Sequence, residues 1–379
     1  MVTKRIHSRA PTRIDLAGGT LDIWPLYLFL NHPLTLNLGI DLFAEATIEE
    51  TPAPLPGSPD SPKFKGIRLI SKDQNAELRF SWDELKQNAI QAPPALELHC
   101  RLLKFFYDQK EKLSPRKSNS NTEFTLTTQA RSPAGAGLGG SSTLSIAIIG
   151  ALASWARDSQ SIDPAQDGES FIEIVRDVES AVISVPAGLQ DYYGAMYGGL
   201  QALYWGPGTH RRECLPLSLL TELENRLLLF YSGKPRNSGI NNWNMFKGFI
   251  DQNKSGEKEV RAKFEKISAA THLLTHAIYK QQWVEAGQAI ADEWATRKTL
   301  APGITTPEID AAFEAAQSLA PVSGKICGAG GGGCFFVYLP DPDVPNLKQQ
   351  IITIFKAERI QHLPFRAVPH GLEVVVTCE

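Results

Sequence analysis

The sequence predicts two α+β domains that meet near residue 210, covering residues 1–210 and 211–379. The chain has 379 residues, enough for two domains that each bury a core. Both halves contain stretches typical of strands and stretches with apolar residues at helical spacing. With 42% hydrophobic and 21% charged residues, the composition is that of a soluble globular protein.

The first half is predicted to begin as a sheet. Residues 9–16 alternate between apolar and polar side chains, as a half-buried strand does, and the glycines at 17–20 form a tight turn after it. Apolar residues at helical spacing predict a helix over 95–113, and the small, apolar segment 141–156 predicts a buried helix. The other expected elements are strands at 34–50, 67–82, 123–130 and 198–205 and a helix at 171–183.

The second half is predicted to contain more helix than strand. It opens with the apolar strand 226–231, and a long helical region follows from about 257 to 299. The remaining expected elements are a helix at 307–319, a strand at 334–339, a helix at 346–357 and a strand at 372–377.

Charge, cysteines and apolar runs exclude several functional classes. The formal net charge of −3 does not favour a nucleic-acid partner, and the five cysteines show no spacing typical of a zinc site or a disulfide framework. No apolar run is long enough to cross a bilayer, and Asp15 and Asp22 interrupt any secretory signal. We therefore expect a cytoplasmic protein with a small-molecule partner and no membrane partner.

A glycine-rich loop at residues 132–143, SPAGAGLGGSST, lies between a predicted strand and a predicted apolar helix. Glycines let backbone N–H groups converge, and the free N–H groups of a first helical turn attract anions, so the loop predicts a polyphosphate site. No lysine follows the glycines, which excludes the Walker A loop. Taken alone, the segment also fits an ordinary strand-to-helix turn.

A second glycine run, GAGGGG at residues 328–333, lies between Lys325 and the predicted strand that begins at Cys334. Such a run allows a close backbone approach to a bulky group. A flexible linker is disfavoured because the glycines interrupt an apolar, strand-like segment rather than joining domains.

Three motifs in order resemble those of the GHMP kinases, the superfamily of galactokinase, homoserine kinase and mevalonate kinase. They are APTRIDLAGGTLD at 10–22, PAGAGLGGSST at 133–143 and KICGAGGGGC at 325–334. The consecutive glycines of the first motif and the segment GLQDYYGAMYGGL at 188–200 are most similar to the bacterial D-glycero-D-manno-heptose phosphate kinase branch. The resemblance implies an N-terminal domain like ribosomal protein S5 domain 2, a ferredoxin-like C-terminal domain, and ATP between them.

The resemblance also implies a catalytic pair and a nucleotide site. Asp191 corresponds to the carboxylate that accepts the proton of the substrate hydroxyl, and Arg13 to the cation that stabilises this carboxylate and the moving phosphoryl group. The nucleotide-binding residues implied by the second and third motifs are Pro133, Gly135, Gly137, Leu138, Gly139, Gly140, Ser141, Ser142, Gly328, Gly330 and Gly331.

By the same resemblance, Ser141 and Glu179 hold Mg²⁺, since oxygen ligands and phosphate oxygens suit this ion. Two further carboxylates, Glu173 and Asp177, lie close to Glu179 in the sequence and leave its assignment open. Ser142 is an alternative helix cap, because serine is common at a first helical turn.

For the acceptor, Asp22 falls where sugar kinases of the superfamily bind ring hydroxyls, so a polyol is favoured over an isoprenoid acid. Gly19, Thr20 and Gly188 complete the implied acceptor site, and the Gly19-Thr20 pair replaces the Glu-His of galactokinase, which disfavours galactose. The loop at 234–239, with Lys234 and Arg236, fits either a substrate phosphate or an ordinary solvated surface.

The expected function is therefore an ATP-dependent sugar kinase, a monomer or a homodimer, that phosphorylates a sugar or sugar phosphate such as a heptose 7-phosphate. The hydroxyl expected to react is the anomeric one. A mevalonate-type kinase is the alternative within the superfamily. A catalytically silent sensor of sugar and ATP is the alternative outside it, although a sensor needs no base such as Asp191.

Overall fold

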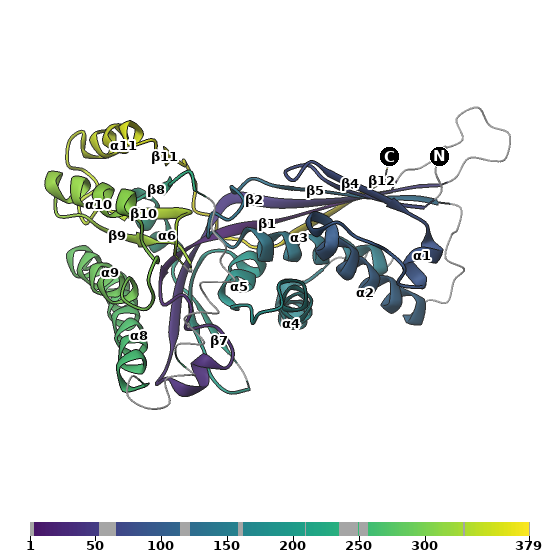
Figure 1. Cartoon of the computed structure of the whole chain (residues 1–379), viewed down its shortest axis with the longest axis horizontal. Helices are drawn as coiled ribbons and strands as arrows, with labels where there is room; N and C mark the ends of the chain where they lie inside the picture. Colours follow the sequence, from purple (N-terminus) through teal and green to yellow (C-terminus); the bar gives the residue numbers. More distant parts are fainter. Residues whose placement is uncertain are drawn as a thin grey trace.

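The computed structural model describes residues 4–52, 66–113, 122–157, 162–208, 210–234, 249, 257–328 and 330–378. The molecule is elongated and contains two sheets, each packed against helices (Figure 1). This mixture of helix and sheet confirms the predicted α+β class. Within these described ranges, no helix is long and apolar enough to span a membrane.

The larger sheet has eight strands in the order β12-β1-β2-β5-β3-β4, with β6 paired to β2 and β7 paired to β6. All neighbours are antiparallel except β3 and β5, which are parallel. Its strands are β1 (Lys4–Ala17), β2 (Leu34–Pro52), β3 (Gly66–Ser71), β4 (Ala76–Phe80), β5 (Thr122–Ala130), β6 (Leu200–Tyr204), β7 (Arg211–Cys214) and β12 (Glu373–Cys378).

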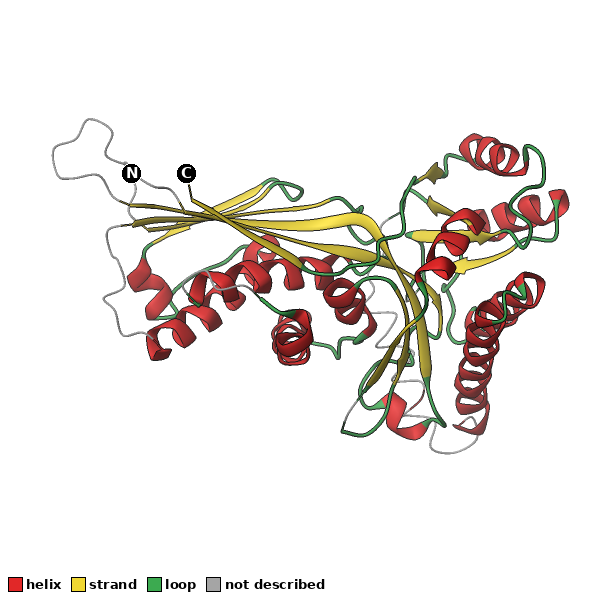
Figure 2. Cartoon of the chain, turned by 180° about the vertical axis from the view of Figure 1, so that it is seen from behind, coloured by secondary structure: helices red, strands yellow, loops and turns green. Residues whose placement is uncertain are grey.

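The long strands β1 and β2 form the spine of this sheet (Figure 2). Their pairing shifts register between Ala10 and Thr12 and again between Asp15 and Ala17, so the ribbon bends twice. Beyond the first bend, β2 leaves β5 and pairs with β6 instead. The bends place the end of β1, with its first-motif residues, at the junction of the two halves.

Helices α1 to α5 cover one face of the larger sheet (Figure 1). The central helix, α3, is buried on nearly all sides, as its small and apolar residues predict. The bounds are α1 (Trp82–Lys86), α2 (Glu97–Leu113), α3 (Gly140–Ala156), α4 (Pro164–Ile183) and α5 (Gln190–Tyr197), with short 3₁₀ turns at Leu26–Phe29 and Pro94–Leu96.

The smaller sheet has the order β11-β8-β10-β9, with all pairs antiparallel. Its strands are β8 (Leu227–Tyr231), β9 (Ser323–Ile326), β10 (Cys334–Tyr338) and β11 (Gln361–His362). The helices of this half are α6 (Leu217–Arg226), α8 (Glu257–Tyr279), α9 (Trp283–Arg297), α10 (Pro307–Leu319) and α11 (Leu347–Ala357).

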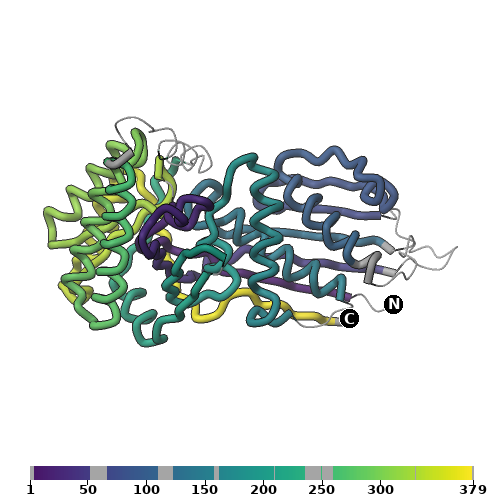
Figure 3. Tube along the Cα trace, turned by 90° about the horizontal axis from the view of Figure 1, so that it is seen from below, coloured from purple at the N-terminus to yellow at the C-terminus, as the bar shows by residue number. Residues whose placement is uncertain are grey.

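The two halves are joined by one continuous apolar core. One buried cluster joins Ile14 of β1 and Leu36 of β2 to Leu274 of α8 and Phe336 of β10. In addition, residues 373–378 return as β12 to pair with β1, so a segment from the end of the second half lies in the sheet of the first (Figure 3).

Several predicted elements have different bounds in the structure. The helix predicted from residue 171 begins at Pro164, because Asp163 caps it by accepting the N–H of Ala165. The helical region 257–299 is two helices, separated near Gln281, whose φ is +54°. The strand predicted at 67–82 is a hairpin, β3 and β4, followed by the start of α1.

Candidate active site

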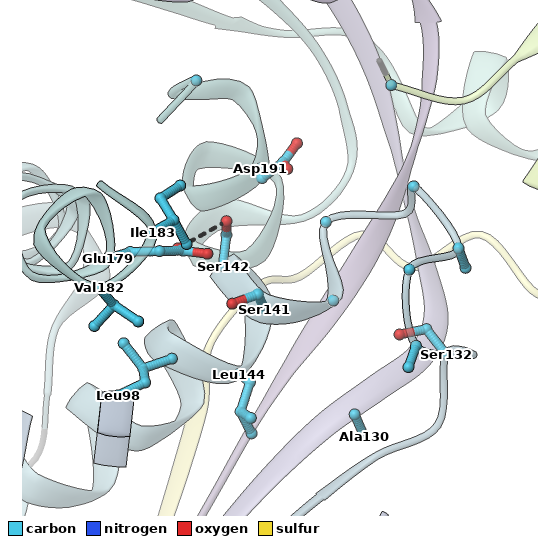
Figure 4. Close-up of a pocket in the computed structure, with 18 of the residues that line it drawn as sticks. Leu98, Ala130, Ser132, Ser141, Ser142, Leu144, Glu179, Val182, Ile183 and Asp191 are labelled. Carbon is cyan, nitrogen blue, oxygen red and sulfur yellow. Dashed lines mark hydrogen bonds between the residues drawn. The ribbon is translucent and has the colours of Figure 1, made fainter. Parts of the chain in front are cut away.

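A cavity of about 380 Å³ lies where the end of β1, the loop before α3 and the facing ends of α4 and α5 meet (Figure 4). It gathers residues from all three motifs. The predicted site residues that line it are Arg13, Thr20, Asp22, Pro133, Gly135, Gly137, Gly139, Gly140, Ser141, Ser142, Glu179, Gly188, Asp191 and Gly328. The other predicted site residues, Gly19, Leu138, Gly330 and Gly331, are not among the described residues that line the cavity.

The second motif ends in the first turn of α3, which opens on the cavity. Gly139 precedes the helix with φ of +75°, and no side chain of the described residues caps the helix. The helix-cap alternative for Ser142 is therefore wrong, because Ser142 lies inside the helix and its hydroxyl is donated to Glu179 instead. The first N–H groups of α3 are consequently available to an anion.

Arg13 and Asp191 form an ion pair at the cavity wall. Nη2 of Arg13 donates to Oδ1 of Asp191, and Nη1 donates to the Gly137 carbonyl at 2.8 Å. Burial alone would lower the pKa of Arg13, but the carboxylates of Asp191 and Asp15 more than offset it and raise that pKa. The guanidinium therefore stays charged, with its carboxylate partner 24% exposed to the cavity.

Glu179 is buried at the cavity wall among hydroxyl groups. Its Oε2 accepts from Ser142 Oγ at 3.0 Å, drawn as a dashed line in Figure 4, and from Tyr192 Oη at 2.6 Å. Burial raises the pKa of Glu179, while the hydrogen bonds from Tyr192, Ser141 and Ser142 oppose this. Tyr192 was not predicted, since a tyrosine beside a catalytic motif has no distinctive pattern.

Asp22 also lines the cavity, and its side chain is buried. Its Oδ2 accepts the backbone N–H of Gln190 at 2.9 Å, and its Oδ1 has no partner among the described residues. Gly188 leaves space for it, because a Cβ there would overlap Oδ2. Burial is the main cause that raises the pKa of Asp22 to about 6, although the Gln190 N–H opposes it.

The third motif docks onto the second. The N–H of Cys334 donates to the Ala136 carbonyl at 2.6 Å, and the N–H of Gly333 donates to the Lys234 carbonyl at 3.0 Å. Gly331 is anchored on the Ile304 carbonyl at 2.7 Å. Only Gly328 of this glycine run reaches the cavity within the described part of the chain.

One end of the cavity is apolar. Leu98, Leu144, Val182 and Ile183 face it from α2, α3 and α4 (Figure 4). Apolar residues at helical spacing are usually core, so their pattern did not predict that they border a cavity.

Family models of known proteins match segments in both halves of the chain. The model of the GHMP kinases N-terminal domain matches residues 102–199, and that of the GHMP kinases C-terminal domain matches residues 274–356. The chain belongs to the GHMP kinases. Membership confirms the resemblance deduced from the three motifs, and with it the expected class of enzyme, a kinase that transfers a phosphoryl group.

Two relatives of this GHMP kinase are bacterial enzymes. The D-glycero-α-D-manno-heptose 7-phosphate kinase of Campylobacter jejuni is 25% identical over 94% of both chains. The L-fucokinase/L-fucose-1-P guanylyltransferase of Bacteroides fragilis is 26% identical to this chain. The match covers 92% of this chain and 36% of the length of that longer enzyme.

Solved structures agree in fold. A D-glycero-D-manno-heptose 1-phosphate kinase from Bacteroides thetaiotaomicron has a TM-score of 0.70 at 20% identity, with 98% of both chains covered. The Lactococcus lactis galactokinase solved with galactose has a TM-score of 0.69 at 15% identity, over 97% of this chain and 95% of that one. These neighbours confirm the two-domain GHMP kinase fold.

Proposed function

We propose that this protein uses Mg²⁺ and ATP to phosphorylate a hydroxyl, the anomeric one, of a sugar or sugar phosphate such as a heptose 7-phosphate. The observation that carries the proposal is the Arg13–Asp191 ion pair, which lies in the same cavity as the uncapped start of α3. An anion site, a fixed cation and a carboxylate in one cavity are the parts that phosphoryl transfer needs.

The nucleotide fits along the second motif. Its phosphates would accept hydrogen bonds from the first N–H groups of α3, beside Ser141 and Gly140. Its base would then extend toward the apolar end of the cavity, at Leu98 and Ile183.

The residues at Glu179 fit Mg²⁺. A buried carboxylate beside the hydroxyls of Ser141 and Ser142 is an oxygen donor set, which this ion prefers. The described residues contain no cluster of three or more acidic, histidine or cysteine side chains, so phosphate oxygens and water would complete the shell. When bound, Mg²⁺ would neutralise charge on the phosphates.

Asp191 would orient the acceptor hydroxyl and take its proton as the new bond forms. Arg13 holds this carboxylate in place and adds a positive charge close to the transferred group. Because both of its Nη atoms are bound to Asp191 and Gly137, the guanidinium is already fixed before any ligand arrives.

The acceptor would lie between Asp191 and Asp22. The free Oδ1 of Asp22 suits a donating hydroxyl, which supports a polyol. Lys234 of the predicted phosphate loop is paired with Glu308 at 2.7 Å, and residues 235–239 lie outside the described residues. A cytoplasmic location and a monomeric or homodimeric state stay predictions.

The test is ADP release from Mg-ATP with a panel of hexoses, L-fucose, heptoses, their terminal phosphates and mevalonate. We expect rapid turnover of one sugar or sugar phosphate, with kcat about 10²- to 10⁴-fold lower in Asp191→Asn. Turnover of mevalonate alone, or an Asp191→Asn variant within a few-fold of the parent, would contradict the proposal.

A further inference from the structure

Four charged side chains are completely buried behind the predicted acceptor turn. Asp15 lies on β1, Glu293 and Arg297 lie on α9, and Lys325 lies on β9. None of the four residues is more than 1% exposed. Their formal charges cancel. Buried charges persist only where each has a partner, so the geometry of this cluster is tightly determined.

Arg297 binds the acceptor turn directly. Its Nη2 donates to the Gly19 carbonyl at 2.7 Å, and its Nη1 donates to Thr20 Oγ1 at 3.3 Å. Glu293 Oε1 accepts from Nε and Nη2 of the same guanidinium, at 2.8 and 2.6 Å. The planar fork therefore has a fixed orientation, which a lysine ammonium does not reproduce.

The turn itself is unusual in conformation. Thr20 has φ of +74°, which a β-branched residue rarely adopts, and a Cβ at Gly19 would overlap Asp15 Oδ2. Such a conformation persists only where surrounding contacts hold it. From the second half of the chain, Arg297 contacts Gly19 and Thr20, and Glu293 Oε1 accepts the N–H of Gly18 at 3.3 Å.

Lys325 completes the cluster. Its Nζ lies 3.0 Å from both the carbonyl and Oδ2 of Asp15 and 3.8 Å from Glu293 Oε1. Asp15 Oδ2 also accepts the N–H of Gly328 at 3.3 Å. The cluster thus connects the first motif to the third.

The turn leads straight to Asp22, two residues after Thr20. Asp22 is in turn bound to the backbone of Gln190, the neighbour of Asp191. A shift of the turn would move Asp22 relative to Asp191. A misplacement of about 1 Å in such a site can lower the reaction rate about 100-fold.

We propose that Arg297 is a positioning residue for the acceptor, which holds the Gly19-Thr20 turn so that Asp22 keeps its place opposite Asp191. This inference rests on the proposed function. It predicts that a change at Arg297 alters the use of the acceptor and spares the use of ATP, whose proposed site is built from the second motif.

The test is the Arg297→Lys variant, which retains the buried positive charge and loses the fork. Steady-state rates with Mg-ATP are measured using D-glycero-D-manno-heptose 7-phosphate, or L-fucose if the parent does not phosphorylate the heptose. We expect the acceptor KM to rise at least about tenfold, with the ATP KM within about twofold of the parent.

A matched control exists in α6. Arg226 donates to Glu222 at 3.0 Å four residues away and to the Pro340 carbonyl at 3.2 Å, and it does not line the cavity. Arg226→Lys makes the same chemical change and should leave both KM values at the parental level. Equal changes in both KM values of Arg297→Lys, or no change in either, would overturn the inference.

If Arg297→Lys does not fold, the hydroxyl of Thr20 provides the second test. Thr20→Val removes the acceptor atom of Nη1 and should raise the acceptor KM with the ATP KM within about twofold of the parent, and Thr20→Ser, which retains that atom, should raise the acceptor KM less. Parental KM values in Thr20→Val would overturn the inference. A parent inactive on every sugar and sugar phosphate of the panel contradicts this inference together with the proposed function, while an active parent with unaffected variants contradicts the inference alone.

Discussion

Asp22→Asn should change how stability depends on pH. The folded protein holds the pKa of Asp22 at about 6, against an ordinary value of 3.8, and burial is the main cause. Each pH unit between these two values corresponds to about 1.4 kcal/mol, so ionising Asp22 in the folded state costs about 3 kcal/mol. Asparagine still accepts the Gln190 N–H but carries no charge.

The direction follows from proton binding. Between pH 4 and 6 the folded state retains a proton on Asp22 that the unfolded chain has released, so the stability of the parent falls as pH rises. Above pH 6 this contribution is constant. Relative to Asp22→Asn, the parent should therefore lose about 2–3 kcal/mol between pH 4 and 7.5.

Urea unfolding of both proteins at pH 4, 5, 6 and 7.5 measures this difference. Asp343→Asn, which changes an exposed carboxylate in the loop before α11, is the control and should follow the parent at every pH. The same Asp22→Asn variant should raise the acceptor KM about 10- to 100-fold, since a hydrogen bond to a charged group contributes about 1.5–3 kcal/mol. If the difference in the free energy of unfolding between the parent and Asp22→Asn does not vary with pH, burial does not raise the pKa of Asp22 and the reasoning is refuted.

Three further changes test other contacts. Gly139→Ala brings a Cβ within 2.9 Å of Asp191 Cγ and should lower kcat. Gly208→Ala is the control: Gly208 is also at positive φ, no atom of the described residues lies within 4 Å of its Cβ position, and the change should cost only backbone strain of about 1–2 kcal/mol. Glu179→Gln should raise the Mg²⁺ concentration for half-maximal ADP release about 10- to 100-fold, and an unchanged Mg²⁺ titration would exclude Glu179 as a ligand. Lys325→Met leaves buried carboxylates without their ammonium partner and should reduce the free energy of unfolding by about 3–5 kcal/mol in urea titrations, whereas parental stability would contradict the ion cluster.

Local patterns predicted much of the fold. Helical spacing located α2 and α10, and the glycine-rich segment before the apolar helix at 141–156 lines the cavity, as expected of a binding loop. The Gly188–Asp191 segment was recognised as a motif but not as the start of α5, because glycine and aspartate are equally typical of turns.

Long-range partners were not predictable in this way. Arg297 lies four residues after Glu293 on a helix, a spacing that usually marks an exposed ion pair. Nothing in that spacing shows that both side chains are buried against the first motif. Likewise, the apolar segment at 372–377 predicts a strand, but its partner β1 lies more than 350 residues earlier in the chain.

The pairing of β12 with β1 has a consequence for biosynthesis. The large sheet presents β1 as an unpaired edge until residues 373–378 have left the ribosome, by which time the second half of the chain is already available to fold. Exposed strand edges attract other chains. The larger sheet is therefore completed only after the second half of the chain has been synthesised, and until then β1 is an edge with which other chains can pair.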